Sequence, residues 1–168
     1  MMNLKQYLKQ PLRALPSSLV IAIFVIALLG FADAAYLTVE HFMGVIPPCS
    51  ITGGCEKVLT SYYSTIYGIP VSLIGTVYYL LIAAGCLIFL ESKHISKLEV
   101  HKSEFLKFSL FLTIPGFVAS LWFVFLQVFV LHSYCAYCMV SATITTILFV
   151  LTVITIKKYR VDMFESLV

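Results

Sequence analysis

The chain has 168 residues, of which 61% are apolar and 11% are charged, and its formal net charge is +3. Soluble domains average about 25% charged residues, and a chain of roughly 150 residues leaves about 30% of its unfolded surface exposed to water. The composition therefore excludes an ordinary soluble domain, a disordered chain and a protein that binds nucleic acid through its basic charge. We expect an all-α integral membrane protein, with residues 1–168 forming a single domain.

Stretches without charge predict the membrane spans, because a helix needs about 20 residues to cross the hydrocarbon core. The stretches 14–32 and 58–90 each accommodate one span. The stretch 108–156 is too long for one helix, and its polar residues 132–134 favour a hairpin. A β-barrel fits poorly because the segments lack alternation of polar and apolar residues. A four-helix bundle is therefore predicted, with helices near 15–38, 68–90, 106–131 and 135–156. The loop between the first two spans carries cysteines, and a short half-helix is expected in it at 56–66.

The basic residues predict the orientation of these helices. Only Lys57 falls in the loop between the first two spans. The ten others precede span one, lie in or beside the loop between spans two and three, or follow span four: Lys5, Lys9, Arg13, Lys93, Lys97, Lys102, Lys107, Lys157, Lys158 and Arg160. The positive-inside rule then places both termini in the cytoplasm, and the 39–67 loop and the 132–134 hairpin outside. We expect the first helix to be retained and not cleaved as a signal peptide.

Four of the five cysteines map to the outward side of this topology. They form two pairs, Cys49 with Cys55 in the first loop and Cys135 with Cys138 at the start of span four. The fifth, Cys86, is expected to be a packing residue inside span two. Three hypotheses remain open for the two pairs: structural disulfides, a four-cysteine zinc site, or a dithiol relay.

Physical chemistry favours the relay for the second pair. Free backbone N–H groups and the helix dipole stabilise an anion at the first turn of a helix, which lowers the pKa of a thiol there. Cys135 would face the loop, and Cys138 would lie deeper, beside the bundle interior. Gly53 and Gly54 would make the loop between Cys49 and Cys55 flexible, which suits a shuttle and equally suits a plain turn.

The ordered motifs resemble those of the vitamin K epoxide reductase family, in particular its prokaryotic members that oxidise protein thiols. The resemblance covers roughly residues 15–157. It is carried by Asp33–Thr38, the spacing Cys49-x5-Cys55, Glu56–Ser61, Tyr67–Gly75 and Tyr134–Cys138.

The resemblance implies a quinone, ubiquinone or menaquinone, as electron acceptor, with no metal. Cys135 and Cys138 would be the active-site pair, with Cys138 meeting the quinone, and Cys49 and Cys55 would be the shuttle pair. Ser61 would lie near the quinone or the shuttle. The partner would be an extracytoplasmic protein of the thioredoxin fold on a separate chain, because no fused thioredoxin-like domain follows the helices. The membrane would be the prokaryotic cytoplasmic (inner) membrane.

Several expectations stay open at this stage. A tyrosine that follows the active-site pair in animal members is Ala142 here, which does not favour vitamin K epoxide as substrate. Asp33, an acid inside an apolar run, is either a structural residue near a helix end or a proton or quinone site. His132 either assists a thiolate or is an exposed hairpin residue. The non-enzymatic alternative is a membrane scaffold or channel with two structural disulfides, and the direction of electron flow is not set by the sequence.

Overall fold

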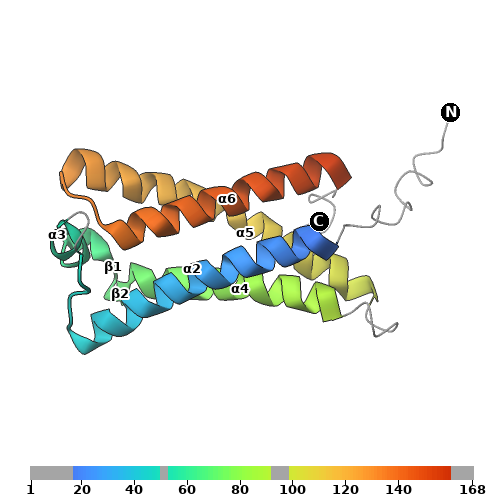
Figure 1. The fold of residues 1–168 in the computed structure, drawn as a ribbon, viewed down its shortest axis with the longest axis horizontal. Coiled ribbons are helices and arrows are strands. Elements are labelled where there is room, and N and C mark those ends of the chain that lie inside the picture. The colour runs from blue at the N-terminus through green and yellow to red at the C-terminus, as the bar shows by residue number, and fades with distance from the viewer. Residues whose placement is uncertain (1–16, 50–52, 92–98, 160–168) are drawn as a thin grey trace.

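The protein is a bundle of four long helices in the computed structural model, which describes residues 17–49, 53–91 and 99–159 (Figure 1). All four helices are long and apolar enough to cross a membrane. The predicted all-α four-helix fold is therefore confirmed. The helices are α2 (Ser17–Met43), α4 (Val71–Glu91), α5 (Glu99–Phe125) and α6 (Ala136–Tyr159).

The helix ends differ from the expected positions for local reasons. α2 was expected to end near 38 but continues to Met43, because Glu40 and His41 remain helical. Asp33 therefore lies ten residues from the end of the helix, about 15 Å at 1.5 Å per residue, instead of close to it. α4 begins after the expected residue 68, because Gly68 takes a φ of +80° in a turn that an α-helix cannot include.

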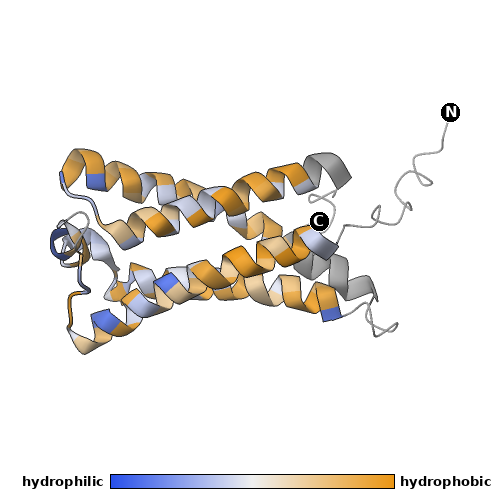
Figure 2. Ribbon diagram, in the orientation of Figure 1, coloured by the Kyte–Doolittle hydropathy of each residue, from blue (hydrophilic) through white to orange (hydrophobic). Residues whose placement is uncertain are grey.

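The core of the bundle consists of apolar side chains from all four helices. α2 and α4 make the most extensive contact. Fully buried members of this core include Ile23, Tyr79, Cys86, Leu110 and Leu148, so Cys86 is a packing residue as expected. Apolar residues also cover the outward faces of the helices along most of their length (Figure 2), as expected for surfaces in contact with lipid.

Glycines let two of the helix pairs approach closely. A Cβ atom placed on Gly30 of α2 would lie 2.4 Å from the Tyr79 ring of α4. A Cβ on Gly116 of α5 would lie 2.4 Å from the Tyr78 hydroxyl of the same α4. Small residues of this kind bring helix backbones together in membrane proteins, where packing and not water drives association.

Short elements gather at one end of the bundle. They are helix α3 (Cys55–Leu59), the 3-10 turn η1 (Tyr62–Ser64), and the two-stranded antiparallel hairpin of β1 (Thr65–Ile66) and β2 (Ile69–Pro70). α3 begins one residue before 56–66, where a half-helix was expected, and η1 lies within that range. The beginning of α2 and the end of α6 lie at the opposite end (Figure 1).

The 131–135 connection turns the chain from α5 into α6 at the same end as α3. The π-helical turn η3 (Leu126–Val130) extends α5 and precedes the connection. Lys5, Lys9, Arg13, Lys93, Lys97 and Arg160 lie outside the described residues, and so do the side chains of Lys102, Lys107, Lys157 and Lys158. The orientation in the membrane therefore stays a prediction.

Candidate functional site

The first cysteine pair is joined: Cys49 and Cys55 form a disulfide. Cys49 is partly exposed, whereas Cys55, the first residue of α3, is fully buried. The Gly53 N–H donates to the Cys49 carbonyl at 3.2 Å, and Gly53 adopts a φ of +62°, a conformation that glycine takes without strain. This part of the loop therefore folds back and turns Cys55 towards the bundle.

Gly54 brings this loop into contact with the second cysteine pair. A Cβ atom on Gly54 would lie 2.7 Å from the carbonyl oxygen of Tyr134 and 2.8 Å from its nitrogen. Gly54 directly precedes Cys55, and Tyr134 directly precedes Cys135. Only a residue without a side chain allows the two backbones to pack so closely. Gly54 is therefore required for the close approach of the two backbones, a role that the sequence did not indicate.

Cys135 lies at the start of α6 and is fully buried. The Met139 N–H donates to the Cys135 carbonyl at 3.0 Å, which is the first helical hydrogen bond of α6. The thiol of Cys138 and the backbone N–H groups of Tyr137 and Cys138 lower the pKa of Cys135 from 9.0 to about 7, against the opposing effect of burial. A larger fraction of Cys135 would therefore be thiolate at neutral pH than of an ordinary cysteine.

The two pairs share one buried cluster. Cys55, Val58 and Cys135 form its centre, and Cys49 and Cys138 pack against it with three other side chains: Leu59, Leu131 and Tyr137. Tyr137, which lies between Cys135 and Cys138 in the chain, also donates its hydroxyl to the carbonyl of Pro48 at 3.2 Å. The residue before Cys49 is thus tied directly to the turn of α6 that carries the second pair.

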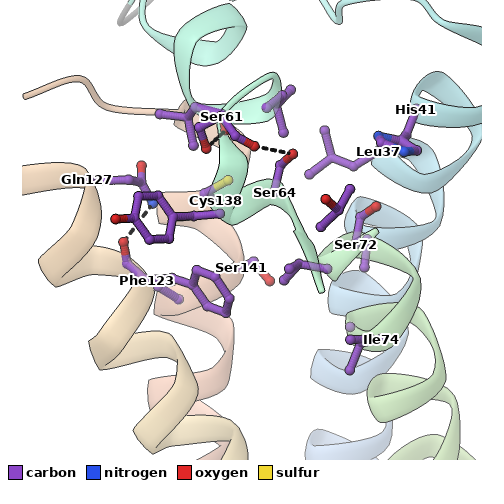
Figure 3. Close-up of a pocket in the computed structure, with 18 of the residues that line it drawn as sticks. Leu37, His41, Ser61, Ser64, Ser72, Ile74, Phe123, Gln127, Cys138 and Ser141 are labelled. Carbon is purple, nitrogen blue, oxygen red and sulfur yellow. Dashed lines mark hydrogen bonds between the residues drawn. The ribbon is translucent and has the colours of Figure 1, made fainter. Parts of the chain in front are cut away.

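A cavity of about 910 Å³ opens beneath this cluster, and Cys138 lies in its wall. α5 and α6 form one side, α2 and α4 form the other, and the segment from α3 to η1 covers it (Figure 3). Ser61 lies in the cover, and Gln127 and Cys138 lie on the side formed by α5 and α6 (Figure 3). Most of the remaining lining is apolar, including Leu37, Ile74, Pro115, Phe123, Val124 and Ala142.

A few polar groups face this apolar cavity. Asp33 and Glu40, two turns apart on α2, both line it, and each has one buried carboxyl oxygen without a hydrogen-bond partner in the described part of the chain. The Ser61 hydroxyl donates to the Val58 carbonyl at 2.7 Å, so its lone pairs remain available to a ligand. Binding sites for small organic molecules typically measure 300–1,000 Å³ and combine apolar walls with a few polar groups, so a quinone ring fits this site.

Two other expectations concern His132 and a metal. His132 is exposed in the hairpin with a φ of +46° and does not line the cavity. The disulfide between Cys49 and Cys55 uses two of the four sulfurs that a four-cysteine zinc site would need. Among residues 17–49, 53–91 and 99–159, no group of three or more histidines, cysteines or acids is arranged to hold a metal ion.

Three residues of the site were missed in the sequence. In the sequence, Gly54 was interpreted only as a source of loop flexibility or a turn, and Tyr137 was assigned no role. Gln127 was passed over, although it is the only amide in the apolar stretch 108–131. A polar side chain in a membrane span is a signal for a buried contact, and that signal could have identified Gln127.

Comparison with known proteins places the chain in a family. Residues 21–153 match the Vitamin K epoxide reductase family. The chain is also 31% identical over 132 residues to the thiol-disulfide oxidoreductase LTO1 of Arabidopsis thaliana. That alignment covers 77% of this chain and 35% of the relative, so the chain spans about a third of the relative's length. The resemblance inferred from the motifs is confirmed: the protein is a multi-pass membrane protein and belongs to the vitamin K epoxide reductase family, a family of oxidoreductases.

Proposed function

We propose that this protein is a membrane thiol oxidoreductase that takes electrons from protein thiols outside the membrane and passes them through its two cysteine pairs to a quinone. The observation that carries this proposal is the backbone contact between Gly54 and Tyr134, which holds Cys55 and Cys135 in one buried cluster. A second observation supports it, since Cys138 lies in the wall of a cavity with the size and polarity of a quinone site.

The first exchange involves the loop pair. A thiolate of the external partner attacks the sulfur of Cys49, the more exposed of the two, and the Cys49–Cys55 bond breaks. The second thiolate of the partner then attacks its own mixed-disulfide sulfur and releases Cys49. The partner leaves with a disulfide, and Cys49 and Cys55 hold two electrons more than before.

The second exchange moves these electrons to the α6 pair. The Cys55 thiolate attacks the sulfur of an oxidised Cys135, and the Cys135–Cys138 bond breaks. Cys49 resolves the new bond, so the Cys49–Cys55 disulfide forms again and Cys135 and Cys138 become a dithiol. The lowered pKa of Cys135 favours the resolution by Cys49, because Cys135 is the leaving group when the Cys55–Cys135 bond breaks and a more stable thiolate leaves more readily.

The third step returns the α6 pair to its disulfide. Cys138, at the cavity wall, is the residue that meets the acceptor. A bound quinone supplies the oxidising power by accepting two electrons and two protons, the number that a dithiol releases when it closes to a disulfide. Asp33 and Ser61, both in the cavity lining, would bind the quinone or pass protons to it.

A partner protein, a membrane and a direction of electron flow complete the proposed relay. The partner is a thioredoxin-fold protein outside the membrane, and the membrane is the prokaryotic inner membrane with both termini in the cytoplasm and the cysteine pairs outside. The net direction depends on the reduction potentials of the two pairs and the quinone. Oxidation of the partner, which supports disulfide formation, is the downhill direction when the acceptor is a quinone.

The test is anaerobic quinone reduction by the purified protein with a reduced thioredoxin-fold carrier. We expect turnover in the unchanged protein and none in the Cys138→Ala variant. The matched control is Cys86→Ala, because Cys86 is a fully buried cysteine of the bundle core and does not line the cavity. It should keep its activity.

Activity that survived in Cys138→Ala would refute the assignment. A complete lack of thiol-dependent quinone reduction, together with disulfides that resist mild reductant, would instead favour a membrane scaffold with structural disulfides. A carrier whose second cysteine is replaced adds a second test: its remaining thiolate breaks the Cys49–Cys55 bond, and it should stay on Cys49 as a mixed disulfide that mass spectrometry can identify.

A further inference from the structure

Gln127 is a buried amide in the π-helical turn that ends the α5 segment. Only 2% of its surface is exposed. The turn, Leu126–Val130, contains one more residue per hydrogen-bonded ring than an α-helix, and such turns concentrate at functional sites. Gln127 also lines the cavity, on the same side as Cys138 (Figure 3).

The hydrogen bonds of Gln127 hold the chain that leads into Cys135. The Cys135 N–H donates to Gln127 Oε1 at 2.9 Å, and the Ser133 N–H donates to the Gln127 carbonyl at 3.1 Å. The side-chain nitrogen makes only a long contact of 3.4 Å with the Phe123 carbonyl. A backbone N–H can pair only with the oxygen of the amide, so the chemistry fixes the orientation of this side chain.

This contact meets a specific need of Cys135. The backbone N–H groups at the start of a helix have no partner within that helix, and Cys135 is fully buried. Without the Gln127 oxygen, this buried N–H would lose its hydrogen-bond partner. The side-chain amide of Gln127 in η3 therefore fixes the backbone of Cys135, and the loop at Gly54 packs against the backbone of the preceding residue, Tyr134.

We infer that Gln127 is a positioning residue, which holds Cys135 in register with Cys55 for thiol–disulfide exchange. The inference rests on the proposed relay. Exchange requires the attacking and attacked sulfurs to meet in a defined geometry, and small displacements reduce the rate of such a reaction strongly. Gln127 acts on this geometry through the backbone of Cys135, and the transfer of electrons stays with the sulfurs.

The experiment measures how favourably Cys55 and Cys135 meet. The full chain carrying Cys49→Ser and Cys138→Ser keeps Cys55, Cys135 and the core cysteine Cys86. Because Cys86 is buried in the bundle core, Cys55 and Cys135 can close a disulfide only with each other. Equilibration of this variant with buffers of reduced and oxidised glutathione gives the effective concentration of one of these thiols at the other. Gln127→Met keeps the length of the side chain and removes the oxygen acceptor. We expect it to lower the effective concentration about tenfold, as expected for an unpaired buried N–H.

The matched control is Thr113→Val on the same helix. Thr113 is fully buried, and its hydroxyl donates to Leu110 within α5 and not to another element. This variant should leave the effective concentration unchanged. An unchanged value in Gln127→Met, or an equal fall in Thr113→Val, would overturn the positioning role and leave the relay intact. A parent that closed no Cys55–Cys135 bond would overturn the relay itself.

Discussion

The two cysteine pairs are held in very different ways. Cys49 and Cys55 lie at the edges of a short loop and are joined by a disulfide, with Cys55 starting a helix of five residues. Cys135 and Cys138 lie at the start of a helix of 24 residues that packs into the bundle. The loop pair is thus held by a short helix and a disulfide, and the α6 pair by a long helix of the bundle, so the proposed relay assigns exchange with the external partner to the first and contact with the cavity to the second.

The largest effect should come from replacing one cysteine of each pair and comparing turnover with a protein carrier and with a small dithiol as reductant. Cys135→Ala should lose turnover by at least about 1,000-fold with every reductant, because removal of a reacting nucleophile is not compensated. Cys55→Ala should lose turnover with the protein carrier but keep turnover with dithiothreitol, which is small enough to enter the cavity. Anaerobic quinone reduction with each reductant measures both.

Equal losses of turnover in the two variants with dithiothreitol would contradict the separate roles of the loop pair and the α6 pair. The assay needs one control, the variant with both loop cysteines replaced. If the loop pair serves only the protein carrier, this double variant should behave as Cys55→Ala does.

The next largest effect should come from Gly54→Ala. Its Cβ would collide with the Tyr134 backbone, which cannot rotate away as a side chain could. A displacement on the order of 1 Å costs about 100-fold in a positioned reaction, so we expect a loss of this size with the protein carrier. Turnover with dithiothreitol should change much less.

Gly53→Ala is the matched control for this variant. Gly53 has a φ of +62°, but no atom lies within 4 Å of its added Cβ. Its cost should be backbone strain of about 1–2 kcal/mol, without a collision. A Gly53→Ala defect as large as that of Gly54→Ala would show that loop conformation, and not contact with Tyr134, limits the exchange.

A smaller effect concerns the pH dependence of Cys135. Its pKa is lowered from 9.0 to about 7, chiefly by the Cys138 thiol, so the thiolate forms as the pH rises through 7. With Cys49 and Cys55 replaced by serine, the rate of alkylation by iodoacetamide should reach half its maximum near pH 7. Addition of Cys138→Ala should move this midpoint towards 9, and the rate at pH 7 should fall at least about tenfold. An unmoved midpoint would contradict the role of Cys138 as donor.

The smallest effect should come from the packing of α2 against α4, within the bundle to which α6 belongs. Gly30→Ala would press against the Tyr79 ring, whereas Gly75→Ala would make an ordinary contact of 3.5 Å with the Ala34 Cβ. We expect Gly30→Ala to lower the free energy of unfolding by about 1–3 kcal/mol and Gly75→Ala to leave it nearly unchanged. Thermal unfolding in detergent measures the difference, and equal transitions would contradict it.

The fold was predictable because charged residues are rare inside membrane spans, so the positions of the charges mark where the spans begin and end. The uncharged stretches located four helices, and the polar residues 132–134 located the hairpin between the last two. The end of α2 was not predictable in the same way. Glu40 and His41 are polar residues, yet both continue the helix and line the cavity, an environment that only the other helices create.

The site was only partly predictable for a related reason. The spacing of the cysteines and the family resemblance pointed to Cys135, Cys138, Cys49 and Cys55. The contacts that join the pairs depend on the tertiary structure. Nothing near Gly54 in the sequence indicates that the Tyr134 backbone lies against it, and Gln127 pairs with Cys135 only because the π-helical turn aims its amide there.

The short spacing of Cys49 and Cys55 has an energetic consequence. Their bridge spans a sequence separation of 6 and, in the chain-entropy treatment, restricts the unfolded chain by only about 2 kcal/mol, against about 4.7 kcal/mol for a loop of roughly 100 residues. The buried core of α2, α4, α5 and α6 lies outside this small ring. Repeated rupture of the bridge during turnover would therefore leave the helices assembled, so the redox state and the integrity of the fold are largely uncoupled.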